Sequence, residues 1–285
     1  IHFYKNFIWE MEKKGHEILL TMQKKDVSIY LAKSYNFSYL YLGSKHKGTI
    51  GKLVGGAYKD IKLLWIAKKT KPDVLTGVLD TYSAKVGKII GKPSIIFTDT
   101  EDAKLGTILT IPFASVVCTP RCFLKDFGRK HIRYNGYHEL AYLHPKYFRP
   151  DPTVLEKIGL SKSDNFTILR LIAWSASHDI NLRGIKKIEE VVKHLEKYGA
   201  VFITSERKLN KKLEKYRVKI SPEKMHSLIY YASLYIGEGG TMAAEAAILG
   251  TPAIHIESTK CGVATGELSG NFRELRDKYG LLYFY

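Results

Sequence analysis

The chain has 285 residues, of which 45% are hydrophobic and 26% are charged, a balance that is typical of a globular protein and excludes a disordered one. Lysine and arginine exceed aspartate and glutamate by 45 − 28 = 17, which favours anionic partners such as a sugar nucleotide, an anionic lipid surface or nucleic acid. A lysine-rich surface of the thermophile kind would carry the same charge without such a partner. No run approaches the roughly 18 consecutive apolar residues that a membrane-spanning helix needs.

The cysteines bear on compartment and metal binding. Cys118, Cys122 and Cys261 are too few and too irregularly spaced for a disulfide framework or a zinc site. The sequence therefore predicts a protein of a reducing cytoplasm, with no bound metal and no resident cofactor. Its positive charge is also compatible with peripheral attachment to the inner face of a membrane.

Helical and strand patterns alternate through the first half of the chain. Apolar residues at helical spacing predict a helix that ends at Gly15, and a second helical pattern covers residues 50–69. Short apolar runs predict strands at residues 17–21, 39–42, 74–76, 94–97 and 116–118. Because a helix precedes the first strand, we expect a leading strand and its loop to be missing from this numbering.

Acidic residues follow two of these predicted strands. Asp80 follows the strand at 74–76, and the cluster Asp99-Thr100-Glu101-Asp102 follows the strand at 94–97. Parallel α/β sheets place their ligands at the carboxyl ends of strands, so these carboxylates are candidates for a general base. Repulsion within the cluster should raise at least one pKa. The alternative is that these acids cap the helices that follow them.

A change in composition separates the two halves. Three prolines and two apolar anchors within residues 144–152 predict a linker, and hence an N-terminal domain of residues 1–149 and a C-terminal domain of residues 150–285. The second half repeats the strand-and-helix pattern. Its first strand, predicted at Phe166–Ala173, contains Arg170, which needs a carboxylate or a phosphate nearby.

The most informative stretch runs from Leu234 to Ile256. It begins with a predicted strand, continues through three glycines at 237–240, and offers Thr241 as the cap of an apolar helix that Gly250 ends. The free N–H groups of such a helix N-terminus attract phosphate. Glu245 lies one turn into this helix, where an unpaired carboxylate would cost several kcal/mol to bury. We therefore expect it to bind a ligand such as a pair of sugar hydroxyls; stabilisation of its own helix N-terminus is the alternative.

The order Gly239, Gly240, Thr241, Glu245 and Leu249-Gly250-Thr251-Pro252 resembles the donor-binding segment of the GT-B superfamily, which includes nucleotide-sugar glycosyltransferases and UDP-GlcNAc 2-epimerases. In those proteins the glycines meet the diphosphate and the glutamate meets the ribose. Most of the chain resembles an uncharacterised, mainly archaeal family of that superfamily, a domain of unknown function (DUF354-like). The resemblance implies an α/β, GT-B-like fold, in which two Rossmann-like domains with parallel sheets face a cleft and the nucleotide lies mainly on the second.

The same resemblance implies further nucleotide-binding residues. The loop after the first strand of the second half would touch the diphosphate through Ser175, Ser177 and His178. Arg170, inside that predicted strand, is a further candidate, because a phosphate of the nucleotide could be the partner that it needs. The loop that begins at Ser205 would meet the base of the nucleotide.

The resemblance also implies catalytic residues in the first half. An Asp-Thr loop and a carboxylate after the next strand border the sugar in the 2-epimerases, which matches Asp80, Asp99 and Glu101. A histidine before the first helix is the catalytic base in many GT-B transferases, and the nearest candidate here is His2. A capping or core role is the alternative for His2.

These features predict a metal-independent GT-B glycosyltransferase that uses a nucleotide-diphosphate sugar, a UDP-sugar, as donor and an unknown hydroxyl as acceptor. The acceptor could be lipid-linked at an anionic membrane surface, and a homodimer is compatible with the sequence. A 2-epimerase that acts on UDP-GlcNAc is the second hypothesis, and a non-catalytic, basic nucleic-acid-binding protein is the third. The sequence contains no P-loop, zincin or α/β-hydrolase motif.

Overall fold

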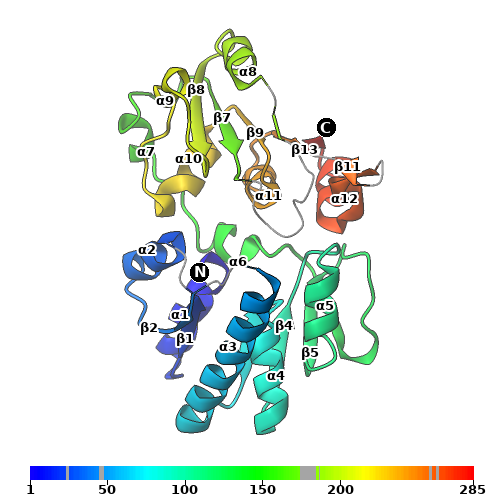
Figure 1. The fold of residues 1–285 in the computed structure, drawn as a ribbon. Helices are drawn as coiled ribbons and strands as arrows, with labels where there is room; N and C mark the ends of the chain where they lie inside the picture. Colours follow the sequence, from blue (N-terminus) through cyan, green and yellow to red (C-terminus); the bar gives the residue numbers. More distant parts are fainter. Residues whose placement is uncertain (24–25, 45–47, 174–183, 186, 257–258, 261–262) are drawn as a thin grey trace. The chain divides into compact units, whose positions relative to one another are not determined.

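The computed structural model describes residues 1–23, 26–44, 48–173, 184–185, 187–256, 259–260 and 263–285. The chain forms two compact units, Ile1–His138 and Glu139–Tyr285 (Figure 1). The proline-rich segment 144–152, where the sequence places a linker, belongs to the second unit.

The first unit contains two parallel sheets. The larger sheet has the strand order β3-β4-β5-β6, and the smaller one pairs β1 with β2. The strands are β1 (Leu20–Gln23), β2 (Tyr39–Gly43), β3 (Leu75–Val78), β4 (Ser94–Phe97), β5 (Val116–Pro120) and β6 (His131–Tyr134). The helices are α1 (His2–Lys13), α2 (Asp26–Ser34), α3 (Thr49–Thr70), α4 (Thr81–Ile90), α5 (Lys104–Thr110) and the 3₁₀ turn η1 (Gly128–Lys130).

Helix α4 packs directly on the larger sheet of the first unit. Its residue Ala84 is fully buried against Ile96 of β4 and Val117 of β5. The side chain of Asp80 starts the helix by accepting hydrogen bonds from the backbone N–H groups of Tyr82 and Ser83. Helices α3, α4 and α5 lie side by side in this layer (Figure 1).

The second unit is built on one five-stranded parallel sheet in the order β13-β10-β9-β7-β8. These strands are β7 (Phe166–Leu171), β8 (Ala200–Ser205), β9 (Leu234–Gly237), β10 (Ala253–His255) and β13 (Leu282–Phe284). Two-residue strands β11 (Thr259–Lys260) and β12 (Val263–Ala264) form a small antiparallel pair. The helices are α6 (Leu140–Leu143), α7 (Thr153–Glu156), α8 (Ile188–Leu195), α9 (Lys211–Glu214), α10 (Met225–Tyr231), α11 (Gly240–Ile248) and α12 (Gly270–Asp277), with 3₁₀ turns η2 (Pro222–Lys224) and η3 (Thr265–Leu268).

Strand β7 lies between β9 and β8 in this sheet and is mostly apolar on both faces. Ile168, Leu169 and Leu171 have no exposed surface, because helices cover both sides of a parallel sheet of this kind. Because both faces of β7 are covered, its sequence is a nearly continuous apolar run and not an alternating one, and that run predicts the strand correctly.

The structure confirms the predicted α/β class with parallel sheets, and most predicted strands lie within two residues of their expected bounds. Several elements were missed, among them α2, β6 and α12 (Gly270–Asp277). One expectation about α11 was wrong: its N-cap is Gly239, and Thr241 lies inside the helix instead of capping it. The predicted end of α11 is confirmed, since Gly250 follows it with φ of 89°.

The N-cap of α4 provides a test of this fold. Replacing Asp80 by Ala should lower the free energy of unfolding of the first unit by about 1–2 kcal/mol, because the first N–H groups of α4 lose their acceptor. Replacing it by Asn keeps a side-chain oxygen and should cost clearly less. Chemical denaturation of the two variants measures the difference; equal losses would show that the carboxylate does not act as a cap.

Candidate functional site

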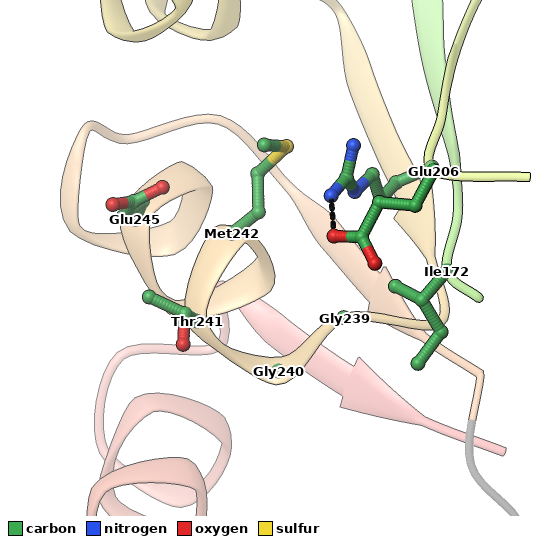
Figure 2. A pocket seen from close by; sticks show the side chains of 8 residues that line it. Ile172, Glu206, Gly239, Gly240, Thr241, Met242 and Glu245 are labelled. Atoms are coloured by element: carbon green, nitrogen blue, oxygen red, sulfur yellow. Dashed lines mark hydrogen bonds and ion pairs between the residues drawn. The ribbon is translucent and has the colours of Figure 1, made fainter. Parts of the chain in front are cut away.

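A pocket of about 220 Å³ lies in the second unit, where strands β7, β8 and β9 end (Figure 2). The carboxyl ends of parallel strands are the usual ligand-binding edge of such a sheet. The pocket combines two acidic side chains, one arginine, two glycines and three uncharged side chains. Its lining residues are Arg170, Ile172, Glu206, Gly239, Gly240, Thr241, Met242 and Glu245.

Two glycines around the turn from β9 to α11, Gly237 and Gly240, leave little room for a Cβ. A Cβ on Gly237 would lie 2.4 Å from the hydroxyl of Tyr235, and one on Gly240 would lie 2.9 Å from the ring of Phe272. Neither is among the glycines with positive φ. The turn therefore uses glycine for close approach, which also lets the backbone of α11 come near a ligand.

The N-terminus of α11 has no side-chain cap. The N-termini of α4 and α12 differ in this respect, because Asp80 and Ser269 accept hydrogen bonds from their first turns. The first N–H groups of any α-helix lack partners within the helix and carry the positive end of its dipole. The start of α11, which lines the pocket, is therefore suited to an anion.

Arg170 brings a cation to the same pocket from the end of β7. It donates a hydrogen bond of 2.7 Å to Oγ1 of Thr204 and forms an ion pair with Glu206, which follows β8. Arg170 was predicted to need a carboxylate or a phosphate nearby, and its partner is the carboxylate of Glu206. Glu206 is half exposed, so the ion pair lies at the mouth of the pocket where a ligand can compete with it.

Glu238, inside the glycine turn, organises the loops around the pocket. Its carboxylate has no exposed surface and accepts hydrogen bonds from the backbone N–H groups of Ile172 and Ile185, at 2.8 and 2.7 Å. It also accepts one from Arg207 at 3.1 Å. Glu238 was not predicted as a site residue, although an acid between glycines at a strand end was a usable signal.

Glu245 has protein partners, which corrects the premise behind its prediction. Its Oε1 accepts a 2.7 Å hydrogen bond from the hydroxyl of Tyr142 and lies 3.0 Å from Nε2 of His226. The carboxylate is therefore buried without being unpaired. It nevertheless lines the pocket, one turn after Thr241 on the same face of α11 (Figure 2).

Ser205, another predicted nucleotide-binding residue, is not among the residues that line this pocket. Ser205 closes a local turn, accepting from the backbone N–H of Arg207 at 3.1 Å and donating to its carbonyl at 2.8 Å. Ser175, Ser177 and His178 lie outside the described residues.

In the first unit Asp99 pairs with a histidine that the sequence analysis did not single out as a site residue. Nδ1 of His138 lies 3.0 Å from Oδ2 of Asp99, and its ring stacks on Tyr134 and contacts Phe3 and Phe97 edge-on. Burial alone would raise the pKa of Asp99, but the hydrogen bond and the charge of His138 outweigh it and hold that pKa below its usual value. Asp99 is therefore not the member of the acidic cluster in which the expected rise of the pKa is found.

The remaining predicted catalytic residues have separate partners. Glu101 accepts a hydrogen bond from the backbone N–H of Leu124 at 3.2 Å. His2 hydrogen-bonds to Tyr35 through Nδ1 at 3.3 Å. Burial raises the pKa of Asp80, although hydrogen bonds from Ser83 and Tyr82 oppose the rise. Asp80, Asp99 and Glu101 are thus engaged with three different sets of neighbours.

Comparison with solved structures defines the class of fold. The UDP-GlcNAc 2-epimerase of Methanocaldococcus jannaschii superposes with a TM-score of 0.65 at 15% identity, over 100% of this chain and 85% of that one. The spinosyn forosaminyltransferase SpnP gives a TM-score of 0.64 at 12% identity, over 99% and 81%. The co-structure of S. aureus MnaA with UDP gives 0.63 at 11%, over 99% and 79%. The chain therefore has the GT-B fold shared by glycosyltransferases and UDP-GlcNAc 2-epimerases.

Sequence comparison gives the family. Residues 1–263 match the family described as protein of unknown function (DUF354), and the chain belongs to it. The uncharacterized protein MJ0665 of Methanocaldococcus jannaschii is 30% identical over 268 residues, which are 89% of this chain and 77% of that protein. The resemblance drawn from the glycine turn and Glu245 is confirmed at the level of family and fold.

The buried imidazole of His255 behind the glycine turn gives a prediction about pH. Burial lowers its pKa to about 4, although its hydrogen bond to the carbonyl of Gly237 opposes this. An unfolded histidine titrates near 6.5, so the unfolded state binds the proton first. The contribution of His255 to stability is complete above pH 6.5 and should fall by about 3 kcal/mol as the pH drops to 4.

The measurement is hydrogen exchange of the β9 and β10 amides at several pH values, in wild type and in His255→Asn. Asparagine keeps a donor for Gly237 but does not titrate. Wild type should lose more protection than the variant between pH 6.5 and 4. Parallel pH profiles would contradict the assignment of a neutral, buried imidazole.

Proposed function

We propose that this protein transfers a sugar from a nucleoside diphosphate sugar, a UDP-sugar, to a hydroxyl acceptor without a metal ion. The observation that carries the proposal is the uncapped N-terminus of α11 beside Arg170 in one pocket. Backbone N–H groups and a guanidinium are the two donors that phosphate binds best in proteins. The GT-B fold and its similarity to MnaA in complex with UDP support the nucleotide.

The pocket can be divided between the parts of the donor. The diphosphate binds at Gly240 and Thr241, next to Arg170, and the ribose binds one helical turn further on at Glu245. Tyr142 and His226 both bind Oε1 of Glu245, which leaves Oε2 to accept from a ribose hydroxyl. A volume of about 220 Å³ is below the roughly 300–1,000 Å³ of whole-ligand pockets, so the base and the sugar extend outside it.

The chemical step follows from this placement. The acceptor oxygen forms a bond to the anomeric carbon, the bond from that carbon to the diphosphate oxygen breaks, and the nucleoside diphosphate leaves with the electron pair. The helix N-terminus and Arg170 stabilise the charge that grows on the leaving group, and such electrostatic stabilisation is usually the main source of catalysis in enzymes. The acceptor hydroxyl passes its proton to a general base as the new bond forms.

A 2-epimerase is the second candidate, favoured by the similarity to the epimerase of Methanocaldococcus jannaschii. Epimerisation needs acid–base groups that remove and return a proton at C2 of the sugar. Asp80 instead caps α4, Glu101 accepts a hydrogen bond from the backbone of Leu124 and Asp99 is paired with His138, so each of the three carboxylates already has a structural partner. The engagements of the carboxylates therefore favour transfer.

The ion pair at the pocket mouth gives opposite predictions for its two partners. Arg170→Gln should weaken the binding of UDP by about 1.5–3 kcal/mol, because a charged hydrogen-bond donor to phosphate is lost. Glu206→Gln should tighten it, because Arg170 is then released from a competing carboxylate. Titration calorimetry measures both, and Arg217→Gln, which breaks a similar pair with Glu214 outside the pocket, is the matched control. Equal effects of Arg170→Gln and Arg217→Gln would contradict the proposed diphosphate site.

Solvent deuterium separates the two enzymatic candidates. Incubation of UDP-GlcNAc with the protein in deuterated water should leave C2 of the sugar without deuterium, because transfer breaks only the bond at the anomeric carbon. Mass spectrometry of the recovered nucleotide sugar gives the result. Deuterium at C2 would replace the transferase proposal by the epimerase one while leaving the nucleotide site intact.

A further inference from the structure

Helix α3 has apolar side chains on two opposite faces. Its inner face, with Leu63, Ile66 and Ala67, packs in the core of the first unit. Its outer face carries large apolar side chains at intervals of four, three and four residues, which places them in one stripe. These side chains keep roughly half to two thirds of their surface exposed: Val54 64%, Tyr58 52%, Ile61 67% and Trp65 64%.

A stripe of this kind differs from the scattered apolar residues of an ordinary surface. Single exposed apolar residues need no explanation, but a contiguous apolar patch marks a site of interaction. The stripe continues onto strand β2, because the Nζ of Lys62 lies 5.6 Å from the ring centre of Tyr41 and 5.8 Å from that of Tyr58. We call the surface formed by Val54, Tyr58, Ile61, Trp65 and Tyr41 the α3 face.

Lysines outnumber acidic residues along α3. The sequence of α3 holds five lysines and one aspartate, and that aspartate, Asp60, is paired with Lys85 of α4. Lys62 and Lys69 lie over aromatic rings of the α3 face, Lys69 at 5.6 Å from that of Trp65, and Lys68 is exposed beside them. The α3 face is thus an aromatic and aliphatic stripe bordered by cations.

We propose that the α3 face docks on an anionic lipid surface. Tryptophan and tyrosine favour the boundary between headgroups and acyl chains, where one end of the ring is apolar and the other is wet. Lysines next to such rings extend to the phosphate groups while their aliphatic stems remain on the apolar surface. The 22 residues of α3 make a rod of roughly 33 Å that lies along the interface.

This attachment is peripheral. Within the described ranges no helix combines the length and the apolar character that crossing a bilayer demands. The inference does not depend on the proposed sugar transfer, because the α3 face shares no residue with the pocket of the second unit.

Two other occupants fit the α3 face less well. Two copies joined through the α3 face would place two lysine-bordered surfaces against each other, and like charges in an interface are unfavourable. Nucleic acid would bind the lysines but would leave Val54 and Ile61 in water. An anionic lipid surface satisfies both the charge and the apolar stripe.

Vesicle co-sedimentation tests the proposal with the full chain. Wild type should bind vesicles of phosphatidylcholine mixed with phosphatidylglycerol and should bind phosphatidylcholine alone much more weakly. The double variant Ile61→Gln/Trp65→Gln should lose about tenfold or more in the partition to mixed vesicles. Glutamine is at least as good a helix former as isoleucine or tryptophan, so α3 should persist, which circular dichroism checks.

The matched control is Tyr198→Gln/Tyr230→Gln, which removes two exposed aromatic side chains of the second unit, 68% and 45% exposed. This variant should bind mixed vesicles as wild type does. Three results would overturn the proposal: no binding of wild type to mixed vesicles, an equal loss in the control, or a wild-type dimer in sedimentation that Ile61→Gln/Trp65→Gln dissociates. UDP titration of the same variants should be unchanged, so a failure here is distinct from a failure of the nucleotide site.

Discussion

The buried carboxylate of Glu238 holds together the chain segments that form the pocket of the second unit. A carboxylate with no exposed surface is costly unless each oxygen is hydrogen-bonded. Here two backbone N–H groups, of Ile172 and Ile185, and the guanidinium of Arg207 provide the donors. Each hydrogen bond to a charged group contributes about 1.5–3 kcal/mol to stability. These bonds therefore hold the loops after β7 and β8 against the glycine turn after β9.

The glycine turn and the start of α11 make this pocket suited to an anion. Close packing of Gly237 and Gly240 against aromatic neighbours brings the start of α11 to the pocket without a side chain in front of it. The helix body is almost wholly apolar and buried, so packing holds α11 in place while the N–H groups of its first turn stay without a side-chain cap. An uncapped, rigid N-terminus beside Arg170 is an arrangement that is stable alone and more stable with an anion.

Local chemistry explains how much of this could be predicted from the sequence. The apolar run of β7, the end of α11 at Gly250 and the need of Arg170 for a partner all depend on residues near in sequence or on general rules, and each is confirmed. Strand β6 was missed because His-Ile-Arg-Tyr lacks an apolar run: the strand lies at the edge of its sheet.

The contacts that could not be predicted join residues far apart in the chain. Tyr142 is 103 positions from Glu245, and only the fold shows that its hydroxyl offsets the cost of burying that carboxylate. The pairing of Asp99 with His138 likewise depends on the order of strands β4, β5 and β6. A charge in an apolar helix signals a partner, but the sequence does not say whether the partner is a ligand or a side chain.

A crystal structure of the chain with UDP tests the central claim most directly. The proposed site predicts phosphate oxygens within hydrogen-bond distance of the backbone N–H groups of Gly240 or Thr241 and of the guanidinium of Arg170, with the ribose at Glu245. UDP bound at another place on the chain, or a pocket that stays without nucleotide at saturating UDP, would contradict it.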